Sequence, residues 1–146
     1  MTDLAGRTAH VAAVLESATV LGRTIGAGHH VPLGDHDLTR SQLQALFTVA
    51  HDRRPVTPSR LVAVLGLTAG AVTQLVDRLR SAGLVETAPN PDDARSRIIR
   101  LTADAADEVD RFEHAIVERL LPRFDALDDH ELHTLADLLE RVTEEP

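Results

Sequence analysis

The most constraining feature of the sequence is a pair of short helical segments with clear start and stop signals in its middle. The first is predicted to begin at the N-cap Thr57, with Pro58 at the first helical position, where a missing N–H costs nothing. Gly66 is predicted to end it, and the second helix runs from the N-cap Thr68 to Gly83. Two short helices joined by a glycine-containing turn are the signature of a helix-turn-helix.

The second of these helices has one apolar side and one narrow polar side. At about 100° per residue the apolar positions cluster on one side, and they are Val72, Leu75, Val76 and Leu79. The opposite side collects Gly70, Gln74, Asp77 and Ser81, flanked by Thr73 and Arg78. Taken alone, this pattern is also typical of an ordinary amphipathic helix whose polar side is exposed to solvent and binds nothing.

Two strand-like runs follow, over residues 84–88 and 98–101, and they predict a β-hairpin. The segment between them is dense in turn formers, so we expect a long polar loop that carries Arg95 and Arg97. An arginine on such a wing can enter a minor groove, where narrow A·T segments concentrate negative potential. A solvated charged turn, in which Asp93 pairs with an arginine, is the simpler alternative.

Charge is divided unevenly along the chain. The net charge is −8, yet residues 51–101 carry eight arginines against five acidic residues, a net +3. The remainder carries seven arginines against 18 acidic residues, a net −11. Such asymmetry indicates that the middle of the chain faces a polyanion while the ends serve another purpose.

In a helix-turn-helix, side chains near the start of the second helix reach base edges in the major groove. Glutamine can bond adenine through two hydrogen bonds, threonine offers a methyl group to thymine, and small residues allow close approach of the backbone. The predicted contacts from this helix are Thr68, Ala69, Gly70, Thr73, Gln74 and Arg78. From the wing, Arg95 is the first choice and Arg97 the second. Arg53, Arg54 and Ser59 are candidates for phosphate contacts that position the DNA without reading its sequence.

Helices are predicted on both sides of this central part. Residues 4–25 carry a heptad-like apolar stripe, and a capping box at Thr39 and Gln42 opens a helix to about His51. After the hairpin, Thr102 begins a helix that Pro122 kinks or ends, and a box-like start at Asp128 opens the last one. We therefore expect a mainly α fold with a small β-hairpin wing: a winged helix-turn-helix over residues 37–101, flanked by helices in 1–36 and 102–146.

The flanking helices present more apolar surface than a winged helix can cover. A two-fold dimer would bury the surplus, because an isologous interface uses the same patch twice. An intrachain bundle of the three flanking helices is the alternative.

Several other function classes find little support. The sequence contains no cysteine, so disulfides, thiolate nucleophiles and Cys-ligated zinc are excluded. Its aromatic residues are three Phe, with no Trp or Tyr, so a single-strand binder that stacks bases on aromatic side chains is not expected. No catalytic motif occurs, so we expect no enzyme activity and no cofactor. No signal peptide or membrane span is expected, which favours a cytoplasmic protein.

A zinc or other divalent-metal sensor stays an open alternative. It rests on His29, His30 and His36, with Asp35 and Asp37 among them, although no recognised ligand spacing occurs.

The segments 57–79, 82–85 and 93–102 resemble the MarR family of bacterial transcription regulators. The most specific feature is the Asp93-x-Arg95 wing followed by Leu101-Thr102. The resemblance implies a homodimer held by N- and C-terminal helices, a recognition helix from Thr68 to Ser81 and a wing centred on Arg95.

The resemblance also implies a protein that binds double-stranded DNA at a pseudo-palindromic operator, usually as a repressor released by a small-molecule effector and less often as an activator. The implied effector pocket lies near the loop after Ile25 and the inner side of residues 39–51. Many relatives have a basic residue where Ala69 and Gln74 stand, so we expect fewer charged contacts from the recognition helix. Operator binding should then be weaker or more salt-sensitive unless the wing and flanking arginines compensate. A winged helix used only for protein contacts is the competing function.

Overall fold

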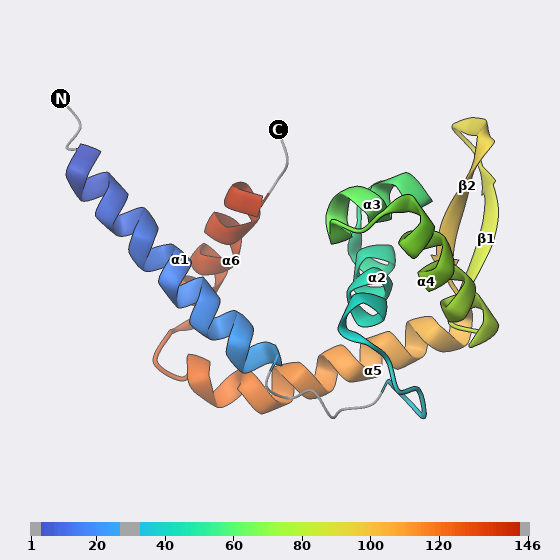
Figure 1. Ribbon diagram of the computed structural model, residues 1–146. Coiled ribbons are helices and arrows are strands. Elements are labelled where there is room, and N and C mark those ends of the chain that lie inside the picture. The colour runs from blue at the N-terminus through green and yellow to red at the C-terminus, as the bar shows by residue number, and fades with distance from the viewer. Residues whose placement is uncertain (1–3, 27–32, 144–146) are drawn as a thin grey trace. The chain divides into compact units, whose positions relative to one another are not determined.

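The computed structural model describes residues 4–26 and 33–143, and it divides the chain into two compact units (Figure 1). One unit is made of residues 29–113, and the other combines residues 1–28 with residues 114–146. The elements of the first of these units are α2 (Arg40–His51), α3 (Pro58–Leu65), α4 (Ala69–Ser81), β1 (Val85–Asn90), β2 (Asp93–Leu101) and the first part of α5 (Ala103–Leu120).

Helix starts and ends in this unit follow the sequence signals. Thr57 Oγ1 accepts a hydrogen bond from the Arg60 N–H at 3.2 Å, and Thr68 Oγ1 accepts one from the Ala71 N–H at 3.2 Å. Gly66 lies between the two helices with a left-handed φ of 63°. The predicted helix-turn-helix, with its caps and its glycine turn, is therefore confirmed.

The core of the unit lies where α2, α3 and α4 meet the hairpin. Its largest fully buried side chains are Leu46, Leu61, Leu79, Val72 and Val85. All four residues predicted for the apolar side of α4 are buried. Burying one side of a helix at this periodicity leaves the opposite side exposed to solvent.

The hairpin differs from its prediction. The strands pair in antiparallel register from Val85↔Leu101 to Pro89↔Arg97, and Asn90↔Asp93 closes a two-residue turn after a register shift. The predicted long polar loop is wrong, because Arg95 and Arg97 lie on β2 itself. A side-chain hydrogen bond joins the two strands near the tip of the hairpin, where Asn90 Nδ2 donates to Ser96 Oγ at 2.8 Å. The periodicity of the sequence does not reveal this contact.

Thr102 ties the hairpin to the helices on either side of it. Its hydroxyl donates to the Gly83 carbonyl at 2.7 Å and accepts the Ala105 N–H at 3.2 Å, while its own N–H donates to the Leu84 carbonyl at 3.1 Å. Thr102 thus caps the start of α5 and links it to the segment that follows α4.

A corner between α2 and α3 is organised by Asp52. One carboxylate oxygen accepts from Arg60 Nε at 2.6 Å and the other accepts the Arg54 N–H at 3.0 Å. These hydrogen bonds, the one from the Arg60 side chain above all, lower the pKa of Asp52 below its ordinary value of 3.8. The neighbouring His51 ring pairs with Glu113 of α5. The turn that carries Arg53 and Arg54 is therefore anchored at both sides.

The other unit contains α1 (Leu4–Gly26), the end of α5, the 3₁₀ helix η1 (Leu121–Phe124) and α6 (Asp129–Thr143). Pro122 lies in η1, so α5 ends where the proline predicted. The box-like start is also confirmed, since Asp128 and Glu131 exchange side-chain-to-backbone hydrogen bonds at 2.9 and 3.0 Å. Arg119 of α5 donates to the Ile25 carbonyl at the end of α1.

We predict that Gly66→Ala lowers the free energy of unfolding by about 1–2 kcal/mol, because an L side chain at this left-handed φ is strained even though the space around it is open. Gly66→Asn is the matched control, since asparagine tolerates this conformation better, and it should cost less. Urea unfolding followed by circular dichroism measures both. Equal stability of Gly66→Ala and the unchanged protein would show that the turn is not held in this conformation.

A second prediction concerns acid stability. Because the folded state lowers the pKa of Asp52, its contribution is present at pH values above 3.8 and is lost as the pH falls through the folded value. Asp52→Asn should lower the free energy of unfolding at pH 7 by about 1–3 kcal/mol, the usual cost of losing a hydrogen bond to a charged group. The difference between the two proteins should begin to shrink only as the pH falls to about 3.8, and it should shrink further below that value. A difference that stays constant with pH would assign the loss to packing.

Candidate nucleic-acid interface

The polar side of α4 is an exposed surface that carries no charge over its first two turns. Thr68, Ala69, Gly70, Thr73 and Gln74 are all exposed, as is Arg78 one turn further on. No side chain fills the space beside Gly70. The structure therefore leaves all six residues predicted on this helix exposed to solvent, and Gln74 and Arg78 lie one helical turn apart.

The hydroxyl groups on this face have defined roles within the helix. Thr68 Oγ1 accepts the cap hydrogen bond from Ala71, so its own hydrogen stays available for an external acceptor. Thr73 Oγ1 donates to the Ala69 carbonyl at 3.0 Å, so it can only accept from outside, and its methyl group is the apolar part it can present. In the described part of the chain, the Gln74 side chain makes no hydrogen bond. Its amide can both donate and accept, as adenine recognition requires.

The two predicted wing arginines differ in their surroundings. Arg97 Nη2 donates to the Thr87 carbonyl at 3.1 Å and to Thr87 Oγ1 at 3.3 Å, so its guanidinium lies against β1. The Arg95 guanidinium is exposed and has no hydrogen bond or ion pair among residues 4–26 and 33–143. The Asp93 carboxylate accepts the Arg95 backbone N–H at 3.0 Å. The alternative in which Asp93 holds an arginine side chain is not the arrangement seen.

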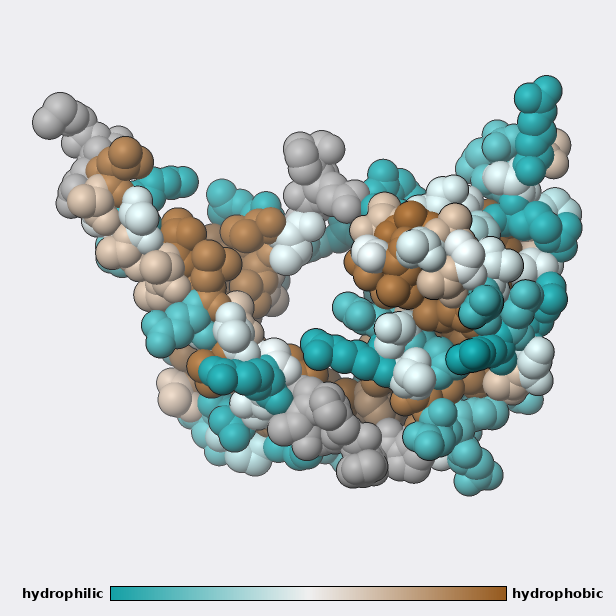
Figure 2. Space-filling view, in the orientation of Figure 1, coloured by the Kyte–Doolittle hydropathy of each residue, from teal (hydrophilic) through white to brown (hydrophobic). Residues whose placement is uncertain are grey.

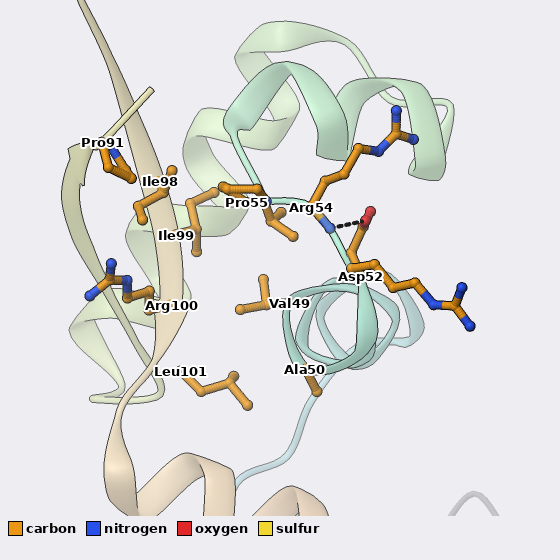
Figure 3. A pocket seen from close by; sticks show the side chains of 12 residues that line it. Val49, Ala50, Asp52, Arg54, Pro55, Pro91, Ile98, Ile99, Arg100 and Leu101 are labelled. Atoms are coloured by element: carbon orange, nitrogen blue, oxygen red, sulfur yellow. Dashed lines mark hydrogen bonds between the residues drawn. The ribbon is translucent and has the colours of Figure 1, made fainter. Parts of the chain in front are cut away.

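Arg53, Arg54 and Ser59 lie exposed at the corner between α2 and α3. A hollow of about 420 Å³ is lined by residues of this corner and of β2 (Figure 3). Figure 3 shows Val49, Ile99 and Leu101 around this hollow and the bond from the Arg54 backbone to Asp52. A backbone bond from the Ile99 N–H to the Val56 carbonyl, at 2.7 Å, holds the corner beside the strand. The basic corner and the base of the wing are therefore neighbours.

A second hollow, of about 210 Å³, lies between the start of α2 and α4. Its lining residues are Thr39, Gln42, Ala71, Gln74, Leu75 and Arg78. From the sequence, Thr39 and Gln42 are predicted only to cap α2, which the structure confirms, and their place beside the polar side of α4 is an additional finding. The sequence contains no signal for this neighbourhood, because it depends on how two helices pack.

The metal-sensor alternative rests largely on residues that the structure does not describe. His29 and His30 lie outside the described residues, and so does most of the predicted effector loop after Ile25. Within residues 4–26 and 33–143, no group of three His, Asp or Glu side chains could hold a metal ion.

Among the described helices, none is long and apolar enough to cross a membrane alone. α3 and α4 satisfy length and composition only when taken together, with a bend of 112° between them. Their most apolar side chains, including Leu61 and Val72, are buried in the core of the unit.

Residues 36–96 match the family model of the MarR family. The chain is 37% identical over 70 residues to the multiple antibiotic resistance protein MarR of Salmonella typhimurium, covering 48% of each chain. It is 31% identical over 71 residues to the transcriptional repressor IacR of Pseudomonas putida, covering 49% of this chain and 42% of the relative. The match thus spans about half the length of these curated relatives.

A solved structure extends the likeness to both units of the chain. The crystal structure of a cysteine-to-serine mutant of MarR from E. coli, complexed with operator DNA, aligns with a TM-score of 0.55 and 28% identity. That alignment covers 98% of this chain and 100% of the other. The helix-turn-helix, the two-stranded wing and the flanking helices follow in the same order as the resemblance implied. The chain thus has the winged helix-turn-helix fold seen in MarR structures, and its residues 36–96 match the MarR family model.

Proposed function

We propose that this protein binds double-stranded DNA through the polar side of α4 and the wing, and thereby regulates transcription. The observation that supports this most directly is the exposed, uncharged start of α4, whose apolar side is completely taken up by the core. Thr73 and Gln74 offer a methyl group and an amide to base edges, and Arg95 offers a cation to a minor groove. The operator-bound E. coli MarR structure supports the same type of partner.

We propose further that the protein acts as a homodimer. α1 and α6 have no buried side chain among their described residues, and several large apolar side chains on them are exposed (Figure 2). They are Leu4, Val11, Val14, Leu15, Val20 and Ile25 on α1 and Leu135, Leu138, Leu139 and Val142 on α6. An intrachain bundle would have covered these side chains. A two-fold interface would remove the apolar area from water and place two recognition helices on one duplex.

Such a dimer fits a pseudo-palindromic operator whose half-site centres lie about 10–10.5 bp, one helical turn, apart. Residues 37–101 would then form the DNA-reading domain, and residues 1–36 with 102–146 the dimerisation region. A repressor role is favoured by the likeness to IacR, whose name describes a transcriptional repressor. Because its target would be bacterial DNA, the protein would work in the cytoplasm.

We also propose that an unidentified small molecule releases the protein from its operator. An effector can do so only if it binds the DNA-competent and the DNA-incompetent arrangements of the two reading domains with different affinity.

A winged helix that serves protein contacts is the alternative, and salt dependence separates the two functions. Fluorescence anisotropy of a labelled duplex taken from the region flanking the gene should show that the logarithm of the binding constant falls linearly with the logarithm of salt concentration. A protein adaptor would show no such slope with this DNA.

Arg95→Ala should weaken DNA binding and reduce the salt slope by about one unit, because it removes one contact to the charged backbone or groove. Arg123→Ala is the matched control, since it removes the same charge from an exposed position in the other unit. Anisotropy titrations at several salt concentrations measure both. An unchanged slope for Arg95→Ala would remove the wing from the binding mechanism.

Gly70→Ala should separate folding from function. The space beside Gly70 is open and alanine favours a helix, so the free energy of unfolding should rise by about 0.5–1 kcal/mol. The added methyl group stands on the proposed DNA-facing side, so the affinity for DNA should fall. Thermal unfolding and anisotropy on the same preparation test both effects, and unchanged DNA affinity would argue against close approach of this backbone to the duplex.

A further inference from the structure

The hollow between the start of α2 and α4, here called the α2–α4 hollow, borders the proposed DNA-reading face. It is lined by Thr39, Gln42, Ala71, Gln74, Leu75 and Arg78 and has a volume of about 210 Å³. Resting on the proposed function, we infer that this hollow receives a phosphate of the DNA backbone. Gln42 and Arg78 are the side chains that hold it, and Gln42 is thereby a positioning contact as well as a helix cap.

The capping box fixes which end of the Gln42 amide is available. Gln42 Oε1 accepts the Thr39 N–H at 2.8 Å, while Thr39 Oγ1 accepts the Gln42 N–H at 3.3 Å. Since only the oxygen can accept, the amide nitrogen is left with two N–H donors. These donors make no hydrogen bond within the described part of the chain. A preoriented donor pair at the edge of a hollow suits an anion with several acceptor oxygens.

Arg78 supplies the charge. Its guanidinium is exposed and makes no ion pair or hydrogen bond within residues 4–26 and 33–143. Its neighbour Asp77 is paired with Arg80 at 2.9 Å. Among the described residues, no carboxylate lines the α2–α4 hollow, so the described side chains around it carry a net positive charge.

The position of the hollow agrees with a backbone phosphate. Gln74 lies one helical turn before Arg78 on the same strip of α4, so a duplex whose base edges meet Gln74 brings its sugar-phosphate chain past Arg78. The dipole of α2 favours an anion in the same place. The N–H groups of Thr39 and Gln42 are already engaged in the capping box, so the side-chain donors carry the recognition.

The competing view is that Gln42 only caps α2, and Gln42→Glu separates the two. Glutamate at this position keeps the capping box, because its carboxylate can still accept the Thr39 N–H. It replaces the two amide donors with a negative charge facing the phosphate. Gln44→Glu is the matched control: it makes the same change in the same helix at an exposed residue that does not line the hollow.

Unfolding curves and DNA titrations by anisotropy are to be measured for both variants on an operator duplex and on an unrelated duplex. We expect Gln42→Glu to be at least as stable as the unchanged protein and to bind both duplexes about tenfold or more weakly, since like charges repel at close range. Gln44→Glu should bind nearly as well as the unchanged protein.

Arg78→Gln should lower the salt slope by about one unit on both duplexes. By contrast, Gln74→Ala should change the preference for one base pair in each half-site.

Two outcomes would overturn the inference. If Gln42→Glu and Gln44→Glu bind DNA equally well, the hollow does not hold a phosphate and Gln42 is only a cap. If Gln42→Glu weakens binding to one half-site sequence alone, its side chain reads a base. The proposed function fails separately, in the case that the unchanged protein shows no salt-dependent DNA binding at all.

Discussion

The structure depends on the way that α4 is packed by its apolar side. Val72, Leu75 and Val76 occupy one side of the helix at a spacing of three and four residues, and burying them against the hairpin and α3 removes their apolar surface from water. The helical repeat then dictates that Thr73 and Gln74 face outward. Because α4 cannot rotate without exposing its core residues, its polar side is held in place, and the left-handed turn at Gly66 sets the direction in which it points.

The distribution of charge separates the residues proposed to read DNA bases from those proposed to hold the DNA backbone. The start of α4 carries no cation, so in the proposed DNA complex base selection would fall to the neutral side chains of Thr73 and Gln74. The positive charge sits around that face instead, at the corner with Arg53 and Arg54, on the wing with Arg95, and beside the α2–α4 hollow with Arg78. Such a division lets the arginines supply most of the salt-dependent affinity while contributing little to sequence preference.

The sequence predicted the features that local chemistry determines. N-cap threonines at 39, 57, 68 and 102, the turn glycine at 66 and the break at Pro122 each act through their nearest neighbours along the chain, and all lie where expected. The candidate residues on α4 are all exposed, as expected, because helical periodicity decides which positions lie outside the apolar side. Whether each of these residues contacts DNA remains a prediction.

What the sequence could not reveal depends on contacts between distant segments. Turn-forming residues around Asp93 suggested a long loop, but hydrogen bonds from Asn90 to Ser96 and from Arg97 to Thr87 extend the strands close to the tip. The bond between Asp52 and Arg60 is likewise formed only once α3 folds back on the end of α2. Gln42 is the clearest case, since its local role as a cap was visible while its place beside Arg78 was not.

The proposed function places the polar side of α4 in the major groove of a duplex at two symmetric positions. Because the chain contains no cysteine, a single Ser81→Cys substitution on that face gives a unique site for a tethered iron chelate that cleaves nearby DNA. The account predicts cleavage at two places about 10–10.5 bp apart and symmetric about the operator centre, and no localised cleavage from Ala12→Cys on α1. Uniform cleavage, or none, from the Ser81 label on DNA that the protein binds would contradict it.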